Sequence, residues 1–236
     1  MKILAMDTSN QTMAVAVIQE QQILGQIQTT VNKNHSKSLM PAIENLMAAI
    51  EMKPSELNRI VVAQGPGSYT GLRIGVTTAK TLASTLNIEL VGISSLKVLA
   101  ANCVGQEAWI VPIMDARRKN VYAGGYQWQD GELVNVLPDQ HIAIADLLEI
   151  VADKNVYFVG EDVQKFQTEI SQLPVASCNT VLSWNYPNGV VLAELGAQAQ
   201  PQTIETFVPN YLKRVEAEEK WLESHEAGDE SYVEKI

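Results

Sequence analysis

The order of the expected strands and helices constrains the fold most, because the same order occurs twice along the chain. In each half, three apolar or alternating segments predict strands joined by short polar turns. Segments with apolar residues three or four positions apart, which are typical of helices, then alternate with further strands. In the first half we expect strands at 3–8, 12–18, 23–27, 60–63 and 90–93, and helices at 36–50 and from about 68 and 94.

The second half follows the same order, with expected strands at 109–114, 121–126, 132–136, 156–159 and 175–178, and helices at 142–151, 162–170 and 187–200. Three hairpin-linked strands followed by alternating helices and strands imply a mixed sheet covered by helices. We therefore predict an α/β chain of two lobes, each reading βββαβαβα. The expected divisions are a first lobe at 1–106, a second lobe at 107–212 and an acidic, partly disordered tail at 213–236.

Composition excludes several classes of protein. The 236 residues carry a net charge of -10, which argues against a surface that grips nucleic acid by itself, since phosphate neutralisation needs clustered Lys and Arg. Two distant cysteines predict neither a disulfide framework nor a zinc site. The first seven residues reach a carboxylate too early for a signal peptide, and no apolar run approaches a membrane span. We expect a cytoplasmic protein.

A glycine-rich turn follows the expected strand at 60–63. Gly65 and Gly67 permit a tight turn, and a hydroxyl of Ser68 or Thr70 can cap the helix that begins there. Such a turn can bind an anion at the helix N-terminus. The pattern is neither a Walker loop nor a dinucleotide fingerprint, because Gly71 is followed by Leu-Arg and a threonine replaces the third glycine. A plain strand-to-helix turn stays the favoured interpretation.

Two further strand ends could line a nucleotide cleft. Asp7 ends the first strand, where a carboxylate could hold a metal-bound nucleotide, although a turn-capping Asp is the simpler interpretation. The matching end in the second half reads Asp115-Ala116-Arg117-Arg118-Lys119, so cationic side chains replace glycines. A solvated basic turn is favoured there. Together with the glycine-rich turn and its helix, Asp7 forms a degenerate phosphate-loop-like set, whose predicted residues are Asp7, Gly65, Gly67, Ser68, Thr70 and Arg73.

No catalytic group or metal site stands out. His35, His141 and His225 share no ligand spacing, and a lone histidine at a helix start is more often a cap or surface residue than a metal ligand. No GxSxG elbow occurs. We expect no nucleophile, no acid–base pair and no bound metal.

The two helices of the first half offer a candidate interface. Small residues four positions apart form a ridge on the second helix, and apolar residues lie beside it and on the first helix. Packing within the lobe explains part of this surface, but a helix that is apolar over much of its circumference lies in a core or meets a partner. The predicted interface residues are Leu39, Met40, Ile43, Met47, Gly71, Leu72, Gly75, Val76 and Ala79.

Several of these motifs together resemble the TsaB (YeaZ) family. They are Met-Asp-Thr-Ser at 6–9, Asn-His-Ser at 34–36, Gly-Pro-Gly-Ser-Tyr-Thr-Gly-Leu-Arg-Ile-Gly at 65–75, Ile-Ser-Ser-Leu at 93–96, Asp-Ala-Arg at 115–117 and Pro-Asn-Tyr-Leu at 209–212. The resemblance covers the chain apart from its tail. It implies the two-lobed actin/Hsp70/sugar-kinase fold, in agreement with the element order.

The resemblance also implies a role in making the threonylcarbamoyl group on adenosine 37 of tRNAs that read codons beginning with adenine. The family works with its catalytic paralogue TsaD and the ATPase TsaE. The HxxxH metal motif of TsaD corresponds here to Ser94 and Val98, and its Ser-Gly-Gly-His turn to Asp115-Ala116-Arg117-Arg118. The resemblance therefore implies that the metal site is absent.

The hypothesis is a non-catalytic partner of TsaD that binds through the two first-lobe helices and pairs with itself when alone. It binds no cofactor of its own, the partner complex uses ATP, and tRNA reaches the chain only through that complex. The main alternative is an independent ATP-binding enzyme of the kinase-like fold with Asp7 and the turn at 65–71 in its site. A glycoprotease is less favoured, because the chain offers no nucleophile.

Overall fold

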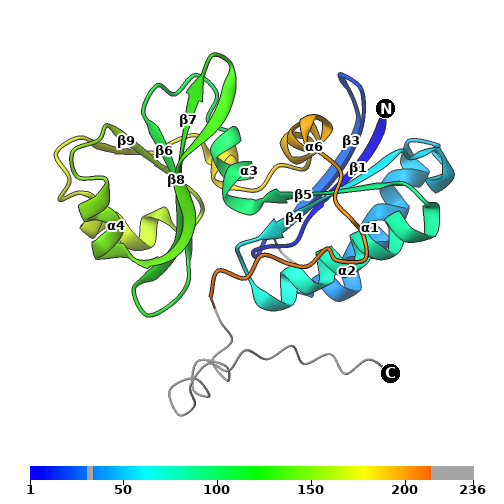
Figure 1. Ribbon diagram of the computed structural model, residues 1–236, viewed down its shortest axis with the longest axis horizontal. Coiled ribbons are helices and arrows are strands. Elements are labelled where there is room, and N and C mark those ends of the chain that lie inside the picture. The colour runs from blue at the N-terminus through cyan, green and yellow to red at the C-terminus, as the bar shows by residue number, and fades with distance from the viewer. Residues whose placement is uncertain (31–33, 214–236) are drawn as a thin grey trace, which may run out of the picture.

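The computed structural model describes residues 1–30 and 34–213 and forms two lobes side by side (Figure 1). The first lobe contains a five-stranded mixed sheet in the order β3-β2-β1-β4-β5. β1 is antiparallel to β2 and parallel to β4, and β4 is parallel to β5. The strands are β1 (Lys2–Asp7), β2 (Met13–Gln19), β3 (Gln22–Thr29), β4 (Arg59–Gly65) and β5 (Glu89–Ser94).

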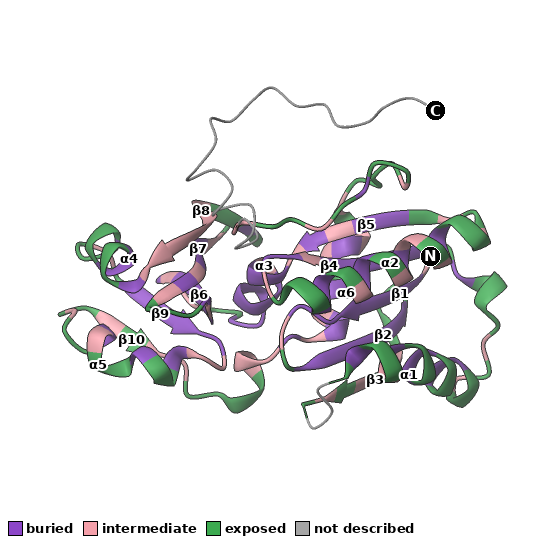
Figure 2. Cartoon of the chain, turned by 90° about the horizontal axis from the view of Figure 1, so that it is seen from below, coloured by how far each residue is buried: buried purple, intermediate pink, exposed green. Residues whose placement is uncertain are grey.

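Helices cover both faces of this sheet, because the side chains of its central strands are apolar on both faces. Leu4 and Met6 of β1 point toward α1 (His35–Ala49) and α2 (Tyr69–Leu86), which lie on one face. Ile3 and Ala5 point to the opposite face, which α6 (Gly189–Gln198) covers (Figure 1). Buried residues fill the central strands β1, β2 and β4, and exposed residues mark the outer side of α1 (Figure 2). This part of the prediction is confirmed.

The second lobe repeats the strand order as β10-β9-β6-β7-β8. Its strands are β6 (Trp109–Asp115), β7 (Asn120–Gln129), β8 (Glu132–Ala143), β9 (Val156–Val159) and β10 (Ala176–Cys178). α4 (Ile144–Ile150), the 3-10 turn η2 (Val163–Phe166) and α5 (Gln167–Ile170) pack over one face of the sheet. The predicted two-lobed α/β fold with duplicated topology is therefore confirmed. The expected helix at 162–170 is instead two short pieces, and β8 is longer than expected.

The last helix of each half packs against the sheet of the other half. α3 (Ser95–Ala101) contributes Leu96 and Leu99 to a core with Ile110 and Tyr126 of the second sheet. α6 contributes Leu192 to the core of the first sheet. The prediction that 107–212 form the second lobe is therefore wrong for α6 and for the segment after it. Apolar periodicity showed that α6 is buried without showing against which sheet.

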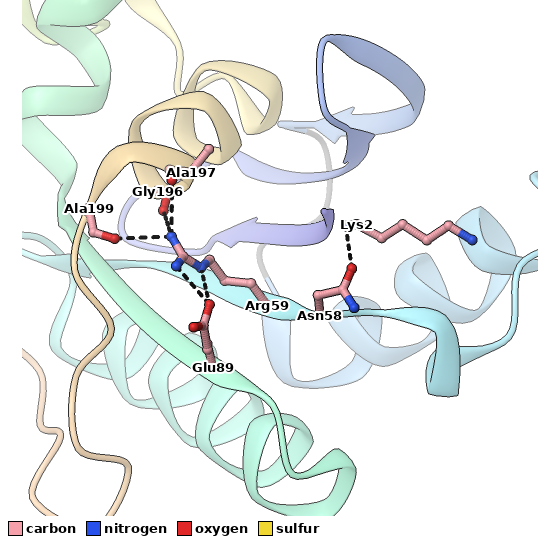
Figure 3. Close-up of polar contacts among 7 residues, drawn as sticks. All are labelled: Lys2, Asn58, Arg59, Glu89, Gly196, Ala197 and Ala199. Atoms are coloured by element: carbon pink, nitrogen blue, oxygen red, sulfur yellow. Dashed lines mark hydrogen bonds and ion pairs between the residues drawn. The ribbon is translucent and has the colours of Figure 1, made fainter.

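Arg59 holds α6 on the first sheet (Figure 3). Its side chain is buried, and one terminal nitrogen donates to the carbonyls of Gly196, Ala197 and Ala199 at 2.6, 3.2 and 3.0 Å. The other terminal nitrogen lies 2.7 Å from the Glu89 carboxylate. A cation therefore satisfies the free carbonyls at the C-terminal end of this helix.

The segment after α6 returns along the first lobe. Gln202 N–H donates to the carbonyl of Leu90, and Asn210 N–H donates to that of Gln64. Phe207 joins the core under α2. No helix in the described ranges is long and apolar enough to cross a bilayer. The acidic tail lies outside the described residues, apart from Lys213.

Candidate functional site

A cleft of about 910 Å³ lies between the two lobes. Most of its walls follow the carboxyl ends of β1, β4, β6 and β9, which are parallel within each pair β1/β4 and β6/β9. Such strand ends meet at one edge of each sheet, where ligands of open α/β folds bind. The main wall segments are 9–11, 34–36, 67–72, 115–117, 161–162 and 210–213. The structure thus brings together the strand ends that the sequence singled out.

The glycine turn packs directly against the β1–β2 turn. A Cβ on Gly67 would lie 2.2 Å from the Ser9 carbonyl oxygen, and one on Gly71 would lie 2.1 Å from that of Thr8. The Ser68 N–H donates to the Ser9 carbonyl at 2.6 Å, and the Thr8 hydroxyl donates to the Gly71 carbonyl at 2.7 Å. The glycines therefore allow two segments of this chain to touch, and an N–H that a phosphate could use is already bonded.

The predicted phosphate-loop-like residues divide into two groups. Gly67, Ser68 and Thr70 line the cleft. Gly65 instead packs on the C-terminal segment, where a Cβ would lie 2.5 Å from the Asn210 carbonyl oxygen at a backbone φ of +119°. The guanidinium of Arg73 lies 5.1 Å from the ring centroid of Tyr69. Ser68 caps α2, accepting from the Gly71 N–H at 3.4 Å, as the sequence predicted.

Asp7 is fully buried beneath the β1–β2 turn. One carboxylate oxygen accepts from the Ser9 N–H at 2.8 Å, as expected of a turn-capping Asp, and the other has no hydrogen-bond partner among the described residues. Burial raises the pKa of this carboxyl, although the Ser9 hydrogen bonds and His35 oppose the shift. His35 is also buried, and its Nε2 lies 2.8 Å from the Asn10 carbonyl oxygen. The N-cap of α1 is Asn34, so His35 is neither the cap nor the surface residue that the sequence favoured.

Carboxylates occupy the corresponding turn of the second lobe. The Asp115 N–H donates to Asp162 and the Arg117 N–H donates to Asp115, each at 2.8 Å. The Lys165 amine bonds Asp115 at 2.9 Å and Asp162 at 2.8 Å, and these two carboxylates raise its pKa. Burial by itself would raise the pKa of Asp115. The hydrogen bonds from Lys165 and Arg117 outweigh burial, so the pKa of Asp115 is lowered. The floor of the cleft is therefore acidic where a phosphate would need free donors.

The basic turn between β6 and β7 has a left-handed backbone. Arg117, Arg118 and Lys119 have φ values of 68°, 51° and 59°, and all three are exposed. A left-handed conformation costs about 1–2 kcal/mol for each such residue. Asn120 stabilises the turn, because its backbone N–H and side-chain amide donate to the Arg117 and Arg118 carbonyls. The predicted solvated basic turn is confirmed, with a backbone strain that the sequence did not indicate.

An aromatic pair stands at the opposite wall. The ring centroids of Tyr69 and Tyr211 lie 4.9 Å apart with planes tilted by 31°, and Arg73 covers Tyr69. Both rings line the cleft and keep 43% and 40% of their surface exposed. Sequence reasoning missed this pair, as it missed Glu161, Asp162 and Lys165. The end of the expected strand before Gly160 could have indicated Glu161, Asp162 and Lys165 as cleft residues. No local sequence pattern connects Tyr69 with Tyr211.

The predicted interface residues lie mostly inside the first lobe. Only Met40 is exposed, at 47%, because α1 and α2 turn the other eight toward their own sheet. A Cβ on Gly75 would lie 2.5 Å from the Thr8 hydroxyl, so the small-residue ridge meets the β1–β2 turn rather than a partner. The prediction is therefore wrong for direct contact by Leu39, Ile43, Met47, Gly71, Leu72, Gly75, Val76 and Ala79.

Comparison with known proteins assigns the chain to a family. The family model described as TsaD, tRNA N6-adenosine threonylcarbamoyltransferase, matches residues 12–221. A Bacillus subtilis protein named tRNA threonylcarbamoyladenosine biosynthesis protein TsaB is 43% identical over 227 residues, which cover 95% of this chain and 99% of the relative. This chain belongs to the TsaB family.

Other relatives of this TsaB-family chain agree. The Escherichia coli protein of the same name is 28% identical over 54% of this chain and 55% of its own length. The solved structure named YeaZ from Pseudomonas aeruginosa is 25% identical, covers 89% of this chain and 99% of that one, and superposes with a TM-score of 0.77. The predicted family resemblance is therefore confirmed.

Proposed function

We propose that this chain is an accessory, non-catalytic subunit that binds a TsaD homologue and, with it, a TsaE homologue. In that complex it is required to form the threonylcarbamoyl group on adenosine 37 of tRNAs that read codons beginning with adenine. The observation that carries the proposal is the 43% identity to a TsaB protein over nearly the full length of both chains. The complex acts in the cytoplasm, where it meets tRNA.

The cleft supports a non-catalytic role. In both turns that could hold a nucleotide's phosphates, N–H groups already donate to this chain: Ser68 to the Ser9 carbonyl in the first lobe, and Asp115 and Arg117 to the Asp162 and Asp115 carboxylates in the second. Phosphate binding needs free N–H donors and cations, and carboxylates repel it. These contacts support the proposal that this chain binds no nucleotide cofactor of its own and that the partner complex uses the ATP.

The outward face of α1 and α2 is the proposed partner surface. Its uncharged exposed residues are Met40 and Ala48 on α1 and Thr77 and Thr81 on α2, and the exposed charged residues beside them are Lys37, Glu44 and Arg73. Interface cores are depleted of charged residues, so we place the centre of the contact on the uncharged positions and its rim on the charged ones. The same face supports self-association when the partner is missing. tRNA meets the chain only within the complex.

A pair of charged substitutions tests this surface. Met40→Glu and Thr77→Glu place a carboxylate on exposed positions, so each variant should stay folded, yet co-elution with the TsaD homologue should be lost because a buried unpaired charge is costly. Ile43 and Val76 are unsuitable, since both are buried and a charge there would unfold the lobe.

The matched control is Thr180→Glu, an exposed position on the second lobe that should leave co-elution unchanged. Retained complexes with both first-lobe variants would place the partner elsewhere. Isothermal calorimetry of the isolated chain with ATP and magnesium addresses the rival enzyme. We expect no tight binding, and micromolar affinity would favour an independent ATP-binding enzyme.

A further inference from the structure

The rim and the floor of the cleft differ in charge. The floor carries the carboxylates of Asp115, Glu161 and Asp162, and the Lys165 ammonium group pairs with Asp115 and Asp162. The left-handed turn exposes Arg117, Arg118 and Lys119, of which Arg117 lines the cleft at its rim, and Lys213 also lies in the cleft wall. An anionic group is therefore attracted to the rim and repelled from the floor.

The tyrosine pair adds a flat surface to the same cleft. The rings of Tyr69 and Tyr211 pack against each other, and the Arg73 guanidinium lies over the Tyr69 ring. Exposed aromatic rings beside cations are the usual means of binding an unpaired nucleotide, because each base can stack on a ring while the phosphates meet the cations. Carboxylates and polar side chains nearby can accept hydrogen bonds from base amino groups and from a ribose 2′-hydroxyl.

We propose that this cleft binds an unpaired segment of RNA, with phosphates on the turn formed by Arg117, Arg118 and Lys119 and a base on the Tyr69–Tyr211 pair. The proposal rests on the proposed function, in which the RNA is the tRNA held by the complex. The net charge of -10 keeps the isolated chain from binding RNA firmly, so the contact acts inside the complex.

The geometry favours RNA over two other anions. Nucleotides of open α/β folds bind at the strand ends, and here the Ser9 carbonyl and the Asp115 and Asp162 carboxylates already accept from N–H groups at those ends, which disfavours a free nucleoside triphosphate. An acidic peptide would use the cations but leave the tyrosine pair without a flat group to stack on. A nucleic-acid strand satisfies both features, since its phosphates can stay at the rim while a base turns inward.

The test measures binding of an unmodified tRNA transcript to the purified complex of this chain with its TsaD homologue, by fluorescence anisotropy at several salt concentrations. The main variant is the triple Arg117→Asn, Arg118→Asn, Lys119→Asn. Asparagine tolerates a left-handed backbone, so the turn keeps its shape while its charge is lost. We expect affinity to fall about tenfold and the salt slope to decrease by about 2, because phosphate contacts dominate salt dependence.

A second variant tests stacking. Tyr211→Leu should weaken tRNA binding about fivefold or more, whereas Tyr211→Phe, which keeps the ring, should bind like the wild type. The charge control is Lys53→Asn with Lys154→Asn, an exposed and a half-buried cation that do not line the cleft, and it should change binding little.

The outcomes separate the two proposals. If the wild-type complex does not assemble in gel filtration, the proposed function fails, and this inference fails with it. If the complexes assemble but the triple variant binds tRNA with unchanged affinity and salt slope, the inference alone is overturned. Displacement of the transcript by ATP with magnesium from the wild type, but not from the triple variant, would assign the site to a free nucleotide and overturn the RNA assignment.

Discussion

At the scale of single residues, small side chains are needed where two segments of this chain touch. Gly67 and Gly71 leave room for the carbonyls of Ser9 and Thr8. Their spacing correctly predicted a turn and a helix with a ridge of small residues. It could not predict what fills the ridge, because the filling segment lies about 60 residues earlier in the chain.

Asp7 and Asp115 are expected to affect stability in opposite directions. Burial raises the pKa of Asp7, so its contribution to stability is present below the unfolded pKa of roughly 3.9 and is lost as pH rises through the folded pKa. Asp7→Asn removes the buried charge and keeps an acceptor for the Ser9 N–H. We expect it to raise the free energy of unfolding at pH 8 by about 1 kcal/mol, with the gain vanishing at acidic pH.

Asp115 provides the matched comparison. Its pKa is lowered, so its contribution is present above the unfolded pKa and is lost as pH falls through the folded pKa. Asp115→Asn should therefore destabilise the protein at pH 8 and become neutral in acid. Urea unfolding at several pH values measures both variants. Loss of stability with Asp7→Asn at pH 8 would show that the buried carboxylate is compensated.

At the scale of elements, the predicted order of strands and helices is confirmed because each segment carries its own period and turn residues. The sheet against which a helix packs, in contrast, is not determined by the local sequence. α6 reads as a buried helix, but its sequence is compatible with either sheet, and the decisive contact is Arg59, more than 130 residues earlier. The same limit explains why α1 and α2 were predicted correctly, while packing within the lobe buries more of their predicted interface residues than the sequence indicated.

We expect the hydrogen bonds from Arg59 to the carbonyls at the end of α6 to stabilise the protein more than the ion pair of Arg59 with Glu89. Arg59→Met leaves the carbonyls of Gly196, Ala197 and Ala199 unpaired, and we expect a loss of about 2–4 kcal/mol in the free energy of unfolding. Glu89→Gln breaks only an ion pair whose carboxylate is 47% exposed, so it should cost less than about 1 kcal/mol. Equal losses in urea unfolding would contradict this division.

At the scale of the whole molecule, the two lobes share their last helices. α3 belongs to the core of the second sheet and α6 to that of the first, and the Asn102 amide joins the end of α3 to the carbonyls of Trp184 and Tyr186. Two independent lobes would unfold separately, whereas shared cores couple them. The lobe boundary predicted from the repeated order of strands and helices therefore does not divide the molecule into two folding units.

Because each lobe contributes its last helix to the core of the other lobe, we predict one cooperative unfolding transition for the intact chain. A fragment of residues 1–106 lacks α6, which covers one face of its sheet, so this fragment should not fold cooperatively by itself. Differential scanning calorimetry of the intact chain should give equal calorimetric and van't Hoff enthalpies. Two separated transitions, or a stable 1–106 fragment, would contradict the shared-core description.

The central claim is that this chain acts through a TsaD homologue rather than by chemistry of its own. The most direct measurement is reconstitution of threonylcarbamoylation on an unmodified tRNA transcript with purified TsaD and TsaE homologues, threonylcarbamoyl-adenylate and ATP, with and without this chain. We predict product only when the chain is present, and normal product with Asp7→Asn, because the proposed role needs no catalytic carboxylate in this chain. An unchanged yield without the chain would contradict the claim.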